Sequence, residues 1–507
     1  MPDAPWAGDA CSLVDAFRAG ERSPLEELDA TLGAIEASDL NAFSFVDPER
    51  ARDAARSADV TLPFGGVPTG IKELETVAGW PTTEASLVFR DRVGSATSTL
   101  VDRLLVGGAV PVGLTTASEF GGLNIGSTRL NGVTHNPWRH GRSPGGSSAG
   151  SAAAVAGGLV PLATGGDGGG SIRIPAGYTG LLGMKGTYGR IPRSPYAYSR
   201  PATVVLGCLA RSVRDAARFY DVCAGYHPAD PSSLPSSGGW ERDLGSHELA
   251  GRRVAVLPAL GGVSEITPDI EQHVRDAAKT LVDATGMVEV DLELDFPNLS
   301  AQWMMGNLAT LLAELGDRWP ACASELTTEV ATGLYLSQSL YNLRTAAVAE
   351  EMRLRAYHVM AEAFERVDFV VAATNPDVAF AADAATSSPT DSFVDAAGES
   401  TAARLAFRAG LGLVRFAAAG FPRLPSTLLD LGARRLPDLV SMGALTIVSN
   451  VCGNPAVSIP AGLVDGLPVG MQVLTRHHAD ALLFDVALAA ERVAPWPLVA
   501  TTAPHTG

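Results

Sequence analysis

The chain has 507 residues, of which 46% are hydrophobic, and it carries a formal net charge of −17 at pH 7. A chain of this length and composition can bury a sizeable core, so we expect a globular protein. The acidic balance, with no cluster of Lys and Arg, argues against a nucleic acid or an anionic membrane surface as partner.

Cysteines and histidines give no sign of a metal site. The five cysteines form no Cys-x-x-Cys pair, and the nine histidines are not spaced as metal ligands. Scattered cysteines are typical of a reducing compartment.

No stretch approaches the roughly 18 apolar residues of a membrane span, and the first residues lack the features of a signal peptide. We therefore expect a cytoplasmic protein without a metal.

The N-terminal region, residues 8–58, shows the periodicity of amphipathic helices. Ser23 precedes a proline and stands three residues before Glu26, which is the pattern of a capping box. A second helix start has the same Pro at its first position, after Asp47. We expect residues 1–60 to form a helical arm.

A strand-like apolar run follows at residues 64–74 (FGGVPTGIKEL), and Lys72 interrupts it. A lysine removed from water favours its neutral form, which makes Lys72 a candidate base. The spacing alone favours a structural lysine that pairs with Glu73 or Glu75, because buried bases are rare. Next, residues 97–107 predict a helix and AVPVGL a buried strand, before a long loop of the kind that is usually functional.

Two serine-bearing turns lie in the glycine-rich stretch 143–177 (SPGGSSAGSAAAVAGGLVPLATGGDGGGSIRIPAG). Ser147 and Ser148 occupy the first turn and Ser171 the second, and the apolar residues between them predict a buried helix and strand. A flexible Gly/Ser linker would lack this apolar centre. The pentapeptide GSSAG also fits the elbow of α/β-hydrolases, but a loop rich in Pro and Gly precedes it where that motif needs a strand.

The glycines before Ser171 allow consecutive backbone N–H groups to face one concavity, which suits an anion. That anion is either a phosphate or the oxyanion that forms when a nucleophile attacks a carbonyl. The stretch lacks the Gly-Lys-Ser/Thr sequence of a phosphate loop. We therefore favour an oxyanion site, with Ser171 as the nucleophile.

Helices and strands alternate through the rest of the chain. Residues 227–246 predict a connector, and residues 381–442 predict a lid or a substrate-facing insertion. The predicted helices cover residues 210–225, 338–366 and 478–493 and a segment that begins at Thr267, and the predicted strands cover residues 252–258, 287–294, 368–374, 456–460 and 468–474. Mixed strand orders in such a pattern predict a single α/β/α sandwich around a large mixed β-sheet.

Three motifs together resemble the amidase signature family, whose hydrolases use a Ser-cisSer-Lys triad: Lys72 in GVPTGIKEL, Ser147 in PGGSSAGSAAA and Ser171 in GGDGGGSIRIPAG. The resemblance extends through TTEASLVF, GGAVPVGLTTASEF, THNPW and LARSVRDAA to NPAVSIPAGLVDGLPVGMQVL, and so covers most of the chain. It implies one amidase domain over residues 1–507, with a signature core at 61–230 and the remainder of the sheet at 250–500.

The resemblance also implies roles for individual residues. Ser171 would form the acyl-enzyme, Ser147 would be the serine held by a cis peptide, and Lys72 would be the base that acts through Ser147. The backbone N–H groups of Gly168, Gly169 and Gly170, with that of Ser171, would form the oxyanion hole. Supporting roles without a chemical step fall to three further residues: Ser148, Asp167 and Arg173.

The implied activity is hydrolysis of the C–N bond of a small carboxamide, without a cofactor, through an acyl-serine that releases a carboxylate and an amine or ammonia. The alternatives are an A-type subunit of a glutamyl- or aspartyl-tRNA amidotransferase, a catalytically silent binding protein, and an enzyme for cyclic amides, esters or carbamates. The binding partner would be a small-molecule amide, and the resemblance leaves open whether the chain forms a homodimer. Pocket walls would come from residues 119–128 and 381–442 and the segment around Cys452.

Some positions depart from the usual family pattern. Glu73 replaces an Asp, Ala149 stands where Gly is frequent, and Gly166 and Gly168 stand where Ser or Thr are common. The resulting GGDGGGS resembles small-amide hydrolases and the nylon-oligomer cyclic-dimer hydrolase more than the tRNA-linked amidotransferase component.

Overall fold

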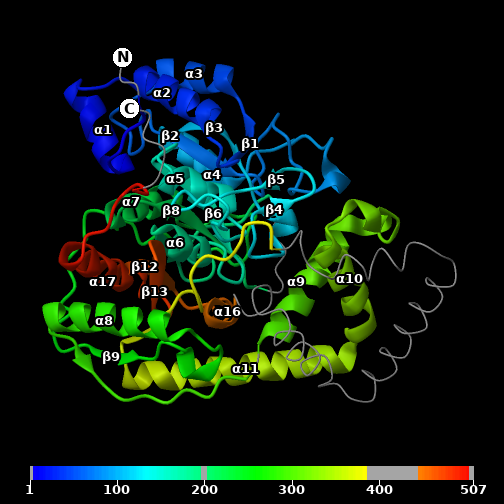
Figure 1. The fold of residues 1–507 in the computed structure, drawn as a ribbon, viewed down its shortest axis with the longest axis vertical. Coiled ribbons are helices and arrows are strands. Elements are labelled where there is room, and N and C mark those ends of the chain that lie inside the picture. Colours follow the sequence, from blue (N-terminus) through cyan, green and yellow to red (C-terminus); the bar gives the residue numbers. More distant parts are fainter. Residues whose placement is uncertain (1–3, 196–201, 298, 385–442, 502–507) are drawn as a thin grey trace.

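A mixed sheet of 11 strands forms the centre of the molecule (Figure 1). The computed structural model describes residues 4–195, 202–297, 299–384 and 443–501. Residues 385–442, most of the predicted lid, lie outside the described residues. In sheet order the strands are β1 (Phe43–Val46), β3 (Val110–Thr115), β2 (Pro68–Lys72), β6 (Leu162–Asp167), β8 (Val205–Ala210), β7 (Leu182–Lys185), β12 (Ala456–Val464), β13 (Leu467–Thr475), β11 (Phe369–Ala373), β9 (Arg253–Val256) and β10 (Val288–Glu289).

Helices cover the sheet, as Figure 1 shows. Every residue of β2, β3, β7, β8, β11 and β13 is buried. Because neighbouring side chains of a strand point to opposite faces, both faces of the sheet must be covered. The described helices are α1 (Ala10–Ala19), α2 (Pro24–Ala37), α3 (Pro48–Arg56), α4 (Thr99–Val106), α5 (Ala149–Ala156), α6 (Arg173–Thr179), α7 (Val213–Cys223), α8 (Pro268–Thr285), α9 (Ser300–Leu315), α10 (Thr328–Leu340), α11 (Leu343–Arg366), α16 (Ala444–Cys452) and α17 (Asp480–Val493). The predicted α/β/α architecture on a large mixed sheet is confirmed.

Both predicted helix starts in the N-terminal region are confirmed. The Ser23 side chain accepts a hydrogen bond from the N–H of Glu26, whose carboxylate in turn accepts the N–H of Ser23 at 2.8 Å. Asp47 caps α3 by accepting the N–H of Arg50 at 3.2 Å. The arm is not wholly helical, however, because β1 lies between α2 and α3 and pairs with β3 at the edge of the sheet.

Three other predictions differ from the structure. The helix predicted over 338–366 is two helices, because the Asn342 side chain caps a new helix by accepting the N–H groups of Arg344 and Thr345. The strand predicted over 287–294 is only two residues long. The start of the helix predicted over 210–225 belongs to β8 instead, and the helix itself begins after Ser212, which caps it.

The order of the central strands brings the segment that contains Lys72 next to the glycine-rich segment that precedes Ser171. β2 lies beside β6 in parallel, with Thr69 opposite Leu162. Lys72 is the last residue of β2 and Asp167 the last residue of β6, so both leave the sheet at the same edge. Ligand sites of open α/β sheets lie outside the carboxyl ends of such strands. Among the described helices, none is both long and apolar enough to cross a membrane.

Candidate active site

Lys72 is held at the end of β2 with its side chain buried and 2% of the residue exposed. Its backbone N–H donates to Thr164 Oγ1 on β6 at 2.8 Å. Its Nζ donates to Ser147 Oγ at 2.8 Å and to Ser148 Oγ at 2.9 Å, and it lies 3.5 Å from the carbonyl oxygen of Gly166. The structure thus joins the lysine to the first serine-bearing turn, across 75 positions of the sequence.

The surroundings of Lys72 favour its neutral form. Burial lowers its pKa from 10.5 to about 8, although the negative charges of Glu75, Asp167 and Glu73 oppose this shift. An appreciable neutral fraction therefore exists near neutral pH, as a base requires.

Glu73 and Glu75 were the alternative partners of this lysine. Among the described residues, the side-chain partners of Lys72 are hydroxyls and a carbonyl, and neither carboxylate forms an ion pair with it. Glu73 turns instead to the loop that follows β3, where it accepts the N–H of Ala117 at 2.6 Å and the amide of Asn131 at 2.9 Å. Burial raises the pKa of Glu73 to about 7.

The first serine turn contains a cis peptide between Gly146 and Ser147. A Cβ on Gly146 would come within 2.6 Å of the backbone nitrogen of Ile125, so only glycine fits here. The carbonyl of Ser147 accepts the N–H of Ser118 at 3.2 Å. Ser148 occupies the N-cap position of α5. A loop and not a strand precedes the turn, in agreement with the rejection of the α/β-hydrolase elbow.

The second turn, between Asp167 and Ser171, is fixed from within. Asp167 is fully buried and accepts the N–H of Gly170 at 2.8 Å, together with two N–H groups of the Arg173 guanidinium at 3.0 Å each. Burial opposes the ionisation of Asp167, but the charge and hydrogen bonds of Arg173 outweigh it and hold the pKa at about 2. The carboxylate is therefore a permanent anchor for the turn.

This arrangement bears on the predicted oxyanion donors. The N–H of Gly170 is directed to Asp167, so it does not point toward a bound carbonyl. The N–H groups of Gly168, Gly169 and Ser171 remain as candidates. The glycine pattern alone shows that the backbone is free to adopt such turns, but not where each N–H group points.

Arg173 connects the turn to distant parts of the fold. Its guanidinium donates to Gln472 Oε1 on β13 at 3.0 Å, to the Thr446 carbonyl oxygen at 2.9 Å and to Asn450 Oδ1 at 2.7 Å, the last two on α16. Ser148 contacts Lys72, and Asp167 and Arg173 hold the second turn; their supporting roles stay predictions. Of the three distant partners of Arg173, Thr446 and Asn450 lie outside the motifs, and Gln472 lies within NPAVSIPAGLVDGLPVGMQVL but was not singled out there.

Lys72, Ser147 and Ser171 line one cavity of about 610 Å³. Gly166 and Gly168 also line it, and residues 120–123 form part of its wall, within the predicted range 119–128. The segment around Cys452 does not line the cavity, contrary to the prediction. Much of the wall comes instead from α9 and α10, which were not predicted to take part: Trp303, Met304, Leu308, Leu311 and Val330.

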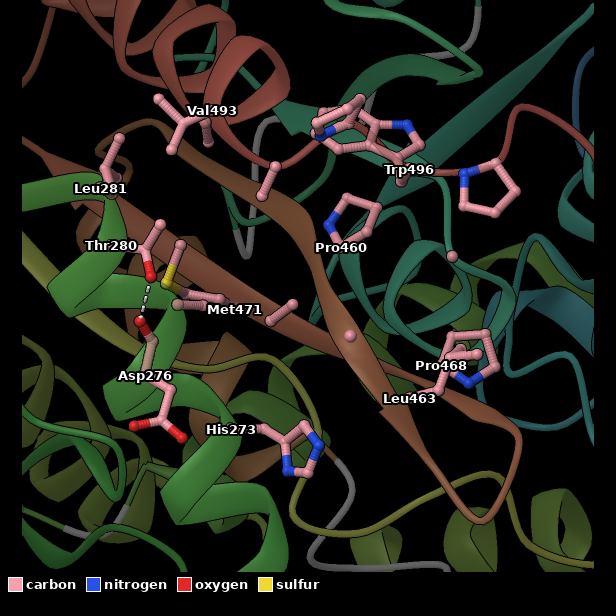
Figure 2. A pocket seen from close by; sticks show the side chains of 18 of the residues that line it. His273, Asp276, Thr280, Leu281, Pro460, Leu463, Pro468, Met471, Val493 and Trp496 are labelled. Carbon is pink, nitrogen blue, oxygen red and sulfur yellow. Dashed lines mark hydrogen bonds between the residues drawn. The ribbon is translucent and has the colours of Figure 1, made fainter. Parts of the chain in front are cut away.

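A second cavity, of about 340 Å³, lies elsewhere between α8, the β12–β13 hairpin and the segment after α17 (Figure 2). Figure 2 shows Met471, Pro460 and Trp496 around it, and none of the predicted site residues lines it. One of its polar residues, Thr280, donates to the backbone carbonyl oxygen of Asp276. Among the residues described, no group of three or more His, Cys, Asp or Glu side chains is placed to hold a metal ion. The larger cavity is therefore the candidate active site.

Residues 26–406 match the protein-family model described as Amidase. The A subunit of glutamyl-tRNA(Gln) amidotransferase from Salinispora arenicola is 32% identical over 95% of this chain and 96% of that protein, and its counterpart from Salinispora tropica is 31% identical over 96% of each. Two solved structures share the fold at 24% identity. A bacterial aryl acylamidase of the amidase signature family has a TM-score of 0.84 over the whole of both chains, and 6-aminohexanoate cyclic dimer hydrolase, complexed with its substrate, has a TM-score of 0.80 over 98% of this chain and 99% of that one.

Proposed function

Because this chain belongs to the amidase family, we propose that it hydrolyses the C–N bond of small carboxamides, with Ser171 as nucleophile, Ser147 as proton relay and Lys72 as base. The observation that carries this proposal is the hydrogen bond of 2.8 Å between Lys72 Nζ and Ser147 Oγ. It lies in a buried site that shares its cavity with Ser171.

The proposed reaction begins with attack of the Ser171 hydroxyl oxygen on the amide carbonyl carbon. The hydroxyl proton passes to Ser147, whose own proton passes to neutral Lys72. Collapse of the tetrahedral intermediate breaks the C–N bond, and the proton returns along the same path to the departing amine. Water, deprotonated by the same relay, then attacks the acyl-serine and releases the carboxylate.

The oxyanion of each tetrahedral intermediate needs donors that are already oriented. We assign this role to the N–H groups of Gly168, Gly169 and Ser171, since Gly170 donates to Asp167. Such oriented donors in a site with little water stabilise developing negative charge strongly. Asp167 and Arg173 hold the turn and carry out no chemical step.

The substrate is a small amide with an apolar part, because Trp303, Leu308 and Leu311 of α9 face the cavity. We propose that the protein acts in the cytoplasm, since all five cysteines are free, as is usual in reducing compartments.

The decisive experiment for the proposed activity is a screen of aryl, aliphatic and cyclic amides, with the corresponding esters and carbamates, against the purified protein. Ser171→Ala should abolish every activity found, and turnover that persists in this variant would overturn the assignment.

A second candidate function is the A-type component of a tRNA-dependent amidotransferase, which the identity of 31–32% to the Salinispora proteins favours. It predicts glutaminase activity and a stable complex with other proteins. The proposed small-amide hydrolase predicts instead that the purified chain is active alone, as a monomer or homodimer. The mass in solution, measured together with glutaminase activity, distinguishes the two.

A further inference from the structure

The glycine turn before Ser171 is fixed from outside by two residues that no motif marks. The indole Nε1–H of Trp303, on α9, donates to the carbonyl oxygen of Gly168 at 2.5 Å. The hydroxyl of Thr446, on α16, donates to the carbonyl oxygen of Gly169 at 2.6 Å. Two consecutive peptide groups of the turn are thus held by side chains from separate helices.

Holding a carbonyl oxygen also sets the direction of the N–H group in the same peptide. In a trans peptide the C=O and N–H bonds point to opposite sides, and neither of these two peptides is cis. Thr446 on the Gly169 carbonyl therefore turns the N–H of Gly170 the other way, and that N–H indeed donates to Asp167 at 2.8 Å. By the same rule, Trp303 on the Gly168 carbonyl directs the N–H of Gly169 away from the indole.

The Trp303 ring also lies against the turn. An added Cβ on Gly169 would come within 2.5 Å of the ring atom Cζ2 and within 3.0 Å of Nε1. The same tryptophan lines the cavity that contains Lys72, Ser147 and Ser171. One side chain therefore touches both the backbone of the turn and the space in which a substrate would lie.

We propose that Trp303 is a positioning residue for amide hydrolysis: its hydrogen bond to the Gly168 carbonyl presents the N–H of Gly169 to the oxyanion of the tetrahedral intermediate. This inference rests on the proposed function. It assigns to α9, a helix outside the motif-bearing part of the chain, a part in stabilising the transition state that acts through the backbone of the turn. A hydrogen-bond donor that is already oriented stabilises the developing negative charge strongly, because it does not have to reorient as the transition state forms.

The test is Trp303→Phe, which keeps an aromatic ring and removes the indole N–H. We expect kcat to fall by about 10-fold to 100-fold while KM stays within about 3-fold, because an interaction realised mainly in the transition state is lost. A trifluoromethyl ketone analogue of the best substrate, which forms an oxyanion adduct, should lose affinity by a similar factor. Trp319→Phe is the matched control, since Trp319 packs against Tyr335 in the same region, with the two rings tilted by 53°, and does not line the cavity.

A wild-type kcat and analogue affinity in folded Trp303→Phe would overturn the inference, whereas a wild-type protein without amidase activity would overturn the proposed function. Gly169→Ala provides a second test if Trp303→Phe fails to fold. The added methyl group would collide with the ring, so we expect a large loss of kcat. A wild-type kcat in folded Gly169→Ala would contradict the inference. Where Trp303→Phe does fold, it should partly relieve the loss in the double variant, and strictly additive effects would contradict the coupling.

Discussion

The ammonium nitrogen of Lys72 lies 2.8 Å from the hydroxyl oxygen of Ser147, although the two residues are 75 positions apart. The contact exists because Lys72 ends a fully buried strand whereas Ser147 immediately precedes the N-cap of α5. Burial at this point makes the lysine a weaker base but also lets it be neutral when it is needed.

The pH dependence of catalysis follows from this site. Lys72 has to be neutral to accept a proton, and its pKa is about 8. We therefore expect kcat/KM of the free enzyme to rise with pH through about 8 and to level off above it. Lys72→Met should lower kcat/KM by about 10³-fold and remove this rise. A variant that keeps both the rise and the rate would contradict the role of Lys72.

The two hydroxyls that contact Lys72 should contribute unequally. Ser147→Ala removes the proposed relay, and we expect kcat to fall by about 10³-fold. Ser148→Ala removes only a hydrogen bond of 2.9 Å that orients the amine, and we expect a loss of about 10-fold. Steady-state kinetics of the two variants on one amide tests the order. Equal losses, or a larger loss for Ser148→Ala, would require a different proton path.

Asp167 should matter for stability as well as for activity. Asp167→Asn leaves the Arg173 guanidinium buried without its carboxylate, and we expect the free energy of unfolding to fall by about 3–5 kcal/mol. The matched control is Asp53→Asn, whose ion pair with Arg56 is exposed, and there we expect a change below about 0.5 kcal/mol. Denaturant unfolding measures both.

In the wild-type protein, acid should remove the contribution that the Asp167 carboxylate makes to the free energy of unfolding. The pKa of Asp167 is lowered in the folded state from 3.8 to about 2. Its stabilisation is therefore complete above about pH 4 and is lost as the pH falls toward 2. Asp167→Asn should show a smaller fall in stability over this interval than the wild type, and an equal fall would contradict the assignment.

Leu308 on α9 should help set the size of substrate that is accepted. Leu308→Ala enlarges the cavity, and we expect the ratio of kcat/KM for bulky aryl amides to that for small aliphatic amides to rise about 10-fold. Leu312→Ala is the control, because Leu312 belongs to the same helix and is partly buried but does not line the cavity. A similar change in both variants would indicate a general loosening of the helix instead.

Local sequence patterns marked the candidate site residues, whose catalytic roles stay predictions. Lys72 was singled out as a lone charge in an apolar strand, and Ser147 and Ser171 by the glycines around them. The family match supports the motif-based interpretation. Trp303 and Thr446 were missed because they lie 135 and 277 positions from the carbonyl groups that they bind, and a tryptophan in an apolar helix is not distinctive.

The fold was predicted with similar limits. Alternating helices and strands indicated the correct architecture, but β8 was overlooked because a short buried apolar run fits a helix or a strand equally well. The four-residue strand β1 was hidden between two helices with strong start signals. Contacts across the sheet, and not the local sequence, decide the structure in both places.

The parallel pairing of β2 with β6 separates two tasks of the molecule. Lys72 ends β2 and Ser171 lies in the turn that follows β6, while residues of α9 and α10 line the cavity beside them. An engineer could therefore exchange these two enclosing helices to obtain new selectivity without redesigning the catalytic groups, provided that the replacement retains an indole at position 303.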